Sequence, residues 1–188
     1  MSFQTVEIHL SYAASLEKLG RKAEADEEMK ECLQRFEKTN KASKAGENDS
    51  SRVDRSLAKS VEANILQKIG IRFRERKDYE RSCDLLEKVL DVRKRMHTKL
   101  TSEAGYSVAS NADLFTGKEF ASLYNDLALT YQGMDDLNTA QEYLILAIQS
   151  YEKMQAPTPD KPLTEEEQLS SLQELADNYL FLADLLRK

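Results

Sequence analysis

Residues 123–147, LYNDLALTYQGMDDLNTAQEYLILA, decide the fold. Apolar and small residues recur there at three- and four-residue steps on both sides of the polar sequence GMDD, which predicts two helices joined by a tight turn. Ala128 and Ala140 are small enough to let the two backbones approach closely, while Tyr131 and Leu144 fill the space beside that contact. One hairpin of this kind cannot bury its apolar surface alone, so the segment predicts a stack of similar hairpins.

The same internal register occurs at four places in the chain. A small residue is followed by a large one three positions later at Ala13–Leu16, Gly70–Phe73, Ala128–Tyr131 and Ala176–Tyr179. In the first three copies a return helix follows, with its packing residues in the order Ala25–Met29–Cys32, Ser82–Leu86–Val89 and Ala140–Leu144–Ala147. The pattern therefore predicts three full hairpins and a final single helix.

We expect an all-α fold of about seven helices that forms a single domain over residues 1–188. The predicted hairpins cover about 3–39, 57–100 and 117–154, the final helix covers about 165–187, and polar connections cover 40–56, 101–116 and 155–164. Thr116, with Glu119 three residues later, predicts a capping box at the start of the third hairpin.

Composition limits the classes of function. The net charge of −6 argues against a general nucleic-acid binder, which needs a basic surface. No apolar run approaches the roughly 20 residues that span a bilayer, so we expect no membrane segment. Residues 1–10 lack the features of a secretory signal. We therefore expect a cytoplasmic protein in which Cys32 and Cys83 are reduced core thiols.

Nothing in the sequence predicts catalysis. His9 and His97 are the only histidines, and neither has a metal-ligating partner three or four residues away. Phosphate-binding glycine loops, Cys-x-x-Cys pairs and nucleophile elbows are absent from the sequence. We expect a protein that is not an enzyme, with no catalytic residue, no cofactor and no metal.

The chain resembles the tetratricopeptide repeat family across the three hairpins and the final helix. The stretches that carry the resemblance best are 69–80 and 123–131, and the second is similar to the first helix of kinesin-light-chain-type repeats. The resemblance implies antiparallel hairpins stacked as a helical solenoid with a concave groove. It also implies a scaffold or adaptor whose function is protein binding.

One feature departs from the family pattern. The intervals between Ala13, Gly70, Ala128 and Ala176 are 57, 58 and 48 residues, whereas the family repeats about every 34. Either the return helices are longer than usual, or long loops connect the units.

In the resembled family the first helix of each hairpin lines the groove, which gives candidate residues for binding a partner peptide. Carried over to this chain, they are Leu10, Asn64, Gln67, Ile71, Arg74, Asn125, Leu129, Gln132 and Gln173. The amides among them could hold an extended backbone, because each has both donors and acceptors. The alternative is that these polar groups only face water.

A second function remains open from the sequence. The final helix carries large apolar residues at Leu175, Tyr179, Leu182 and Leu186, and an exposed apolar face of that size needs cover. The chain could therefore be a structural subunit that forms a homo-oligomer through this helix, or that docks into a larger complex through its helical ends.

Overall fold

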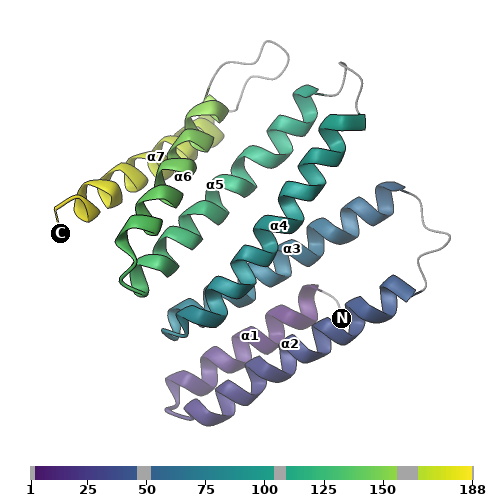
Figure 1. The fold of residues 1–188 in the computed structure, drawn as a ribbon. Helices are drawn as coiled ribbons and strands as arrows, with labels where there is room; N and C mark the ends of the chain where they lie inside the picture. The colour runs from purple at the N-terminus through teal and green to yellow at the C-terminus, as the bar shows by residue number, and fades with distance from the viewer. Residues whose placement is uncertain (1–2, 46–51, 104–108, 156–164, 188) are drawn as a thin grey trace. The chain divides into compact units, whose positions relative to one another are not determined.

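The computed structural model describes residues 3–45, 52–103, 109–155 and 165–187 (Figure 1). Seven helices and no strand occupy these ranges, so the fold is all-α, as predicted. The helices are α1 (Phe3–Lys18), α2 (Lys22–Ala45), α3 (Arg52–Glu75), α4 (Tyr79–Glu103), α5 (Ala109–Gly133), α6 (Leu137–Gln155) and α7 (Glu165–Leu185).

The chain divides into two compact units, residues 1–72 and residues 73–188. Unit 1 contains α1, α2 and most of α3, while unit 2 contains the last turn of α3 together with α4 to α7. A single domain over 1–188 stays a prediction.

Unit 1 has its core between the two helices of the first hairpin. The repeat residues predicted to face each other are buried: Ala13 and Leu16 on α1, and Ala25, Met29 and Cys32 on α2. Lys68 of α3 forms an ion pair with Glu7 of α1, which links α3 to the hairpin. Small residues at the closest approach and larger ones beside it thus build this core, as the repeat register predicts.

In unit 2, helices α4, α5, α6 and α7 pack in chain order, each against the next (Figure 1). Ala128, Ala140 and Leu144 are completely buried and form one cluster with Ile148 of α6 and Leu185 of α7. Partly buried residues cover this cluster: Tyr131, Leu137, Tyr143, Leu175, Phe181 and Leu182. The opening sequence segment is therefore the centre of unit 2.

The three hairpin turns share one backbone geometry. In each turn the second residue after the first helix takes a positive φ: Gly20 at 76°, Lys77 at 63° and Asp135 at 64°. Its amide and the amide of the following residue donate to carbonyls of the last helical turn, at 2.8 to 3.1 Å. This is the Schellman arrangement, which satisfies carbonyls that a helix end would otherwise leave without a donor.

An aspartate then begins the return helix in two of the three turns. Asp136 accepts a hydrogen bond from the amide of Thr139 (3.2 Å), and Asp78 accepts one from the amide of Arg81 (3.3 Å). Both are N-cap contacts, because the amides of the first helical turn have no partner within the helix. Arg21 stands at the corresponding place in the first turn, and its side chain pairs with Glu24 instead.

Helix boundaries differ from the sequence expectation in the polar stretches. Helix α2 continues to Ala45, α3 already begins at Arg52, and α5 already begins at Ala109. Four helices therefore have 24 or 25 residues, and the long repeat interval comes mainly from long helices. The predicted capping box is wrong, because Thr116 lies inside α5 rather than at its start.

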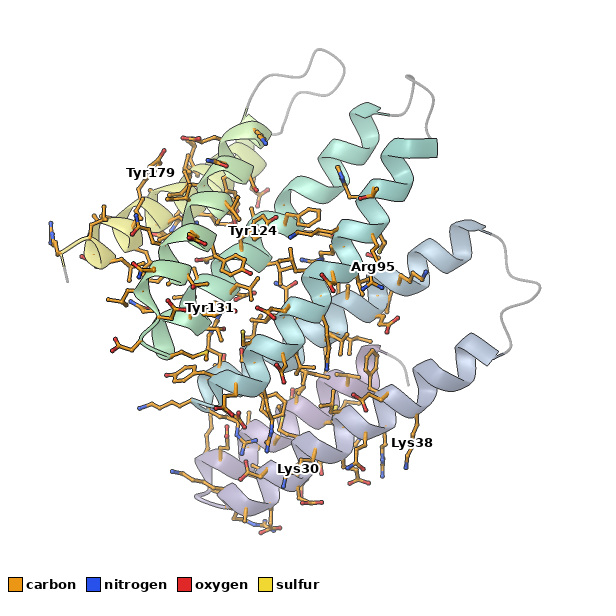
Figure 2. The ribbon with its side chains drawn as sticks, viewed as in Figure 1. Lys30, Lys38, Arg95, Tyr124, Tyr131 and Tyr179 are labelled. Carbon is orange, nitrogen blue, oxygen red and sulfur yellow. The ribbon has the colours of Figure 1, made fainter. Side chains whose placement is uncertain are left out.

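Aromatic rings form a continuous row along one side of the α5–α6 hairpin. Phe120 stacks on Tyr124 at a centroid distance of 5.9 Å, and Tyr124 stacks on Tyr143 at 6.1 Å. Tyr143 then stacks on Tyr131 at 5.5 Å, and the hydroxyl of Tyr131 donates to Glu87 of α4. Figure 2 labels Tyr124 and Tyr131 on α5. These contacts hold the hairpin together and join it to α4.

Candidate functional site

A pocket of about 380 Å³ lies on unit 2, between α5 and α7. It is lined by Lys118, Ser122, Asn125, Asp126, Leu129, Tyr151, Glu174, Asp177, Asn178 and Phe181. Five of these residues come from one face of α5, at spacings of three, four and one residues, and four come from one face of α7. The two helices therefore present facing sets of side chains, and Tyr151 of α6 lies between them in the lining. We call this the unit 2 pocket.

The α5 wall is held by an ion pair. Nη1 of Arg74 lies 2.8 Å from Oδ1 of Asp126 and also donates to the carbonyl of Asp126 at 3.1 Å. Both side chains are largely buried. Because Arg74 neutralises Asp126, the pocket lining carries little net charge at this position.

Tyr151 and Glu174 join α6 to α7. Burial raises the pKa of the Tyr151 phenol well above its ordinary value, and a hydrogen bond to Glu174 raises it further. Tyr151 is therefore a neutral hydroxyl at physiological pH.

Asn178 is the most buried polar residue of α7, at 3% exposed. Its Nδ2 donates to the carbonyl of Glu174 at 2.7 Å, which fixes the orientation of the amide because a carbonyl can only accept. Oδ1 of Asn178 has no hydrogen-bond donor in the described part of the chain. An unsatisfied buried acceptor is costly, so the amide favours a donor in its neighbourhood.

Five of the predicted groove residues belong to unit 2. Asn125 and Leu129 line the unit 2 pocket, and Arg74 supports it through Asp126. Gln132 is half-buried and Gln173 is exposed, and neither lines the pocket. The structure thus brings two of these five predicted residues together at one pocket.

The other four predicted residues belong to unit 1. Leu10 is only 4% exposed and belongs to the core, and Gln67 is buried as well. The expectation that these two side chains face a ligand needs correction, because core packing already surrounds them. Asn64 and Ile71 are half-buried.

Sequence reasoning missed most of the α7 wall. Because the repeat register aligns Ala176 with Ala128, Gln173 was the predicted binding residue on α7. The structure instead has Glu174, Asn178 and Phe181 in the pocket lining. Their spacing of four and three residues is the helical signal that would have grouped them. Tyr151 was missed because it lies on a return helix, which the family comparison does not assign to the groove.

An ion pair joins α4 to α5. Arg93 is buried, and its Nη1 donates to the carbonyl of Glu119 at 2.5 Å, while its Nε lies 3.8 Å from the Glu119 carboxylate. Burial lowers the pKa of Arg93 and raises the pKa of Glu119. Arg93 remains charged, because a guanidinium does not lose its proton in proteins. This arginine therefore joins α4 to α5.

In the described ranges, no three His, Cys, Asp or Glu side chains come close enough together to hold a metal ion. Within the same ranges, no helix is both long enough and apolar enough to cross a membrane.

Antiparallel helical hairpins that share one turn geometry and one packing register are typical of helical-repeat proteins. Residues 63–97 and 120–154 match the family model of the tetratricopeptide repeat. These two segments lie on α3 and α4 and on α5 and α6, and they support an assignment to the tetratricopeptide repeat family. No curated protein matches the chain. Repeats of this family generally mediate protein–protein interactions and are typically non-catalytic.

Proposed function

We propose that the protein is an adaptor that binds a segment of a partner protein, and that the unit 2 pocket is part of its binding surface. Asn125 and Leu129 carry this proposal, because residues predicted from the family register to contact a ligand line a pocket that α5 and α7 build together. The amide of Asn125 can bond a peptide backbone, and Leu129 with Phe181 can contact an apolar side chain. The proposed cytoplasmic location of the protein stays a prediction.

The charges of the pocket favour a basic peptide. Its lining carries the carboxylates of Asp126, Glu174 and Asp177 against the single ammonium group of Lys118. Asp126 is neutralised by Arg74, and Asp177 forms no ion pair with another described residue. The remaining negative charge and the acceptor Oδ1 of Asn178 both favour a lysine or arginine side chain.

A random peptide library tests the proposal. Peptides are selected on the full chain and then measured by fluorescence anisotropy against the wild type, Asn125→Ala and Leu129→Arg. We expect selected peptides rich in lysine or arginine whose dissociation constants rise at least about tenfold with either variant, which corresponds to about 1.4 kcal/mol. Affinity should also fall with rising salt, since the attraction is partly between exposed charges.

Asn138→Ala is the matched control, because Asn138 is an exposed amide on α6 outside the pocket. It should leave peptide affinity unchanged. Selection of peptides that bind all three variants as well as the wild type would place binding elsewhere. Selection of no peptide would remove support for an adaptor of this kind.

A second candidate function is docking through the helical end formed by α7. The observation that favours it is the exposure of large apolar side chains on this helix and directly after its end: Leu169, Leu172, Tyr179, Leu180 and Leu186. Such a patch on a single helix is typical of an interface with another helix. This function would make the protein a structural subunit, and it is compatible with peptide binding at the unit 2 pocket.

A further inference from the structure

The exposed side of α7 carries a heptad pattern. Leu169, Ala176 and Ala183 stand at every seventh position, and Leu172, Tyr179 and Leu186 stand three residues after each of them. All six residues are exposed, including Leu169 at 68% and Leu186 at 65%. We call these six residues the α7 seam. A spacing of three and four residues that is kept over the whole helix is the pattern of a helix that packs against another helix along its length.

The side of α7 next to the seam already has its partner. Leu175, Leu182 and Leu185 pack into the cluster that contains Ala140 and Leu144 of α6. This cluster contains none of the six seam residues. Among the described residues of the seam, Tyr179 contacts α6 through a hydrogen bond from its hydroxyl to Glu152; Figure 2 labels Tyr179.

The α5–α6 hairpin shows which kind of element packs against such a helix face. Ala128 of α5 holds the repeat position that Ala176 holds in α7, and Ala128 is completely buried beside Ala140 and Leu144 of the antiparallel helix α6. At α7 no described helix takes the place of α6. The face is thus built for an antiparallel helix with small residues at the contact.

The sequence of the seam is complementary to itself. When two copies of α7 are set antiparallel about a centre between Asp177 and Asn178, Ala176 of one copy faces Tyr179 of the other. Leu172 then faces Ala183, and Leu169 faces Leu186, so that two of the three kinds of contact combine a small residue with a large one.

The charges at the edges of the seam agree with this arrangement. Glu166 and Arg187 both stand on the same flank of the seam, near its two ends. In the antiparallel pair, Glu166 of each copy comes beside Arg187 of the other. In the single chain Arg187 has only an exposed contact with Asp184 at 3.8 Å, which it can exchange at little cost.

From these observations we infer that the occupant of the α7 seam is the α7 seam of a second copy of this chain, in an antiparallel two-fold pairing. The inference rests on the second function proposed above, docking through α7, and names its partner. The same surface patch serves both copies, as a two-fold interface requires. The second copy takes the place beside α7 that α6 takes beside α5.

Sedimentation velocity over about 1–100 µM protein tests the pairing. We expect the wild type to shift from monomer to dimer, and Leu172→Glu to remain monomeric because it places a charge in the seam. Ile8→Glu is the control, since Ile8 on α1 is, like Leu172, an exposed large aliphatic residue, at 69% against 51% exposed, and it lies outside the seam. Ile8→Glu should dimerise like the wild type. A wild type that is monomeric throughout would overturn the inference.

Cysteine cross-linking tests the direction of the pairing. Leu172→Cys and Ala183→Cys are oxidised separately and as a mixture, with the wild type as background for Cys32 and Cys83. We expect disulfide-linked dimers chiefly in the mixture, because only then do two introduced cysteines face each other. Cross-linking of each variant alone, as strongly as in the mixture, would indicate a parallel pair and contradict the inference.

A further measurement separates this inference from the function on which it rests. A fluorescent peptide with the sequence of residues 137–155 is titrated against the wild type and Leu172→Glu. Binding to a monomeric wild type that Leu172→Glu abolishes would keep α7 as a docking surface while excluding the second copy. A monomeric wild type that binds no peptide would contradict both.

Discussion

The carboxylate of Asp136 connects the end of one helix to the start of the next. It accepts hydrogen bonds from the hydroxyl of Thr139 at 2.7 Å and from the Thr139 amide, and these bonds lower its pKa. Asp135, immediately before it, holds the left-handed conformation of the turn. Two adjacent aspartates thus have different physical roles, and only the second one acts through its charge.

Replacing Asp136 tests the cap. Asp136→Ala should lower the midpoint of thermal unfolding by about 2–4 °C, because the first turn of α6 loses its acceptor. The stabilisation from the charge is complete above the unfolded pKa of about 3.9 and is lost as the pH falls through the lower folded value. Circular dichroism melts between pH 7 and pH 3 measure both effects.

Asp136→Asn is the control for this prediction, since asparagine caps helices about as well as aspartate but carries no charge. Its midpoint should stay near that of the wild type at pH 7, and it should lack the wild type's extra loss between pH 4 and pH 3. Equal pH dependence of the two proteins would show that the Asp136 charge does not stabilise the turn.

At the scale of elements, one repeat position has two environments. Ala128 is completely buried between α5 and α6, while Ala176 is exposed on α7. Ala128→Leu should destabilise unit 2 by about 1–3 kcal/mol, because three added carbon atoms cannot fit where two backbones meet. Ala176→Leu should change the stability by less than about 0.5 kcal/mol.

Urea unfolding followed by circular dichroism compares the two variants, at a protein concentration low enough to keep the chain monomeric. The substitution is the same in both, so the difference reports packing and not helix propensity. A loss at Ala176→Leu as large as at Ala128→Leu would mean that the exposed face of α7 is covered within one chain.

The element scale also shows what the sequence could predict. Helix cores were predictable wherever apolar residues recur, as at Leu127, Ala128 and Tyr131. Helix ends were not, because the polar residues of α2 beyond Thr39 and of α3 before Leu57 give no periodic signal, although lysine and alanine favour helix. The orientation of α7 was not predictable either. Its register resembles that of α5, yet Ala176 is exposed and Asn178 is buried, and no helix among the described residues covers Ala176.

The same reasoning applies to the candidate site. Asn125 and Leu129 could be placed on one helix face from their spacing alone. The partners that complete the pocket, such as Tyr151 and Asn178, depend on how three helices pack, and packing is a property of their combined side chains. A sequence pattern therefore predicted one wall of the pocket and missed the other.

At the scale of the whole molecule, each unit contains one thiol. Cys32 in unit 1 is completely buried, and burial raises its pKa to about 11. Cys83 in unit 2 is half-buried, and burial raises its pKa as well. Both are free thiols, and their different accessibility makes them separate reporters of the two units.

Alkylation by iodoacetamide at pH 8 should modify Cys83 first and Cys32 at least about tenfold more slowly, because Cys32 reacts only when unit 1 opens. Peptide mass spectrometry of timed samples measures each rate. In 6 M urea the two rates should become similar, as a control for intrinsic reactivity. Equal rates in the native protein would contradict the burial of Cys32.

The positions of the tyrosines, several of which stack in the α5–α6 hairpin, determine which part of the protein near-ultraviolet measurements report on. The chain has no tryptophan, and of its eight tyrosines only Tyr12 belongs to residues 1–72. Near-ultraviolet absorbance, fluorescence and circular dichroism therefore report almost entirely on residues 73–188. A melting curve recorded from the tyrosine signal therefore follows unit 2, and unfolding of unit 1 alone would change that signal only through Tyr12.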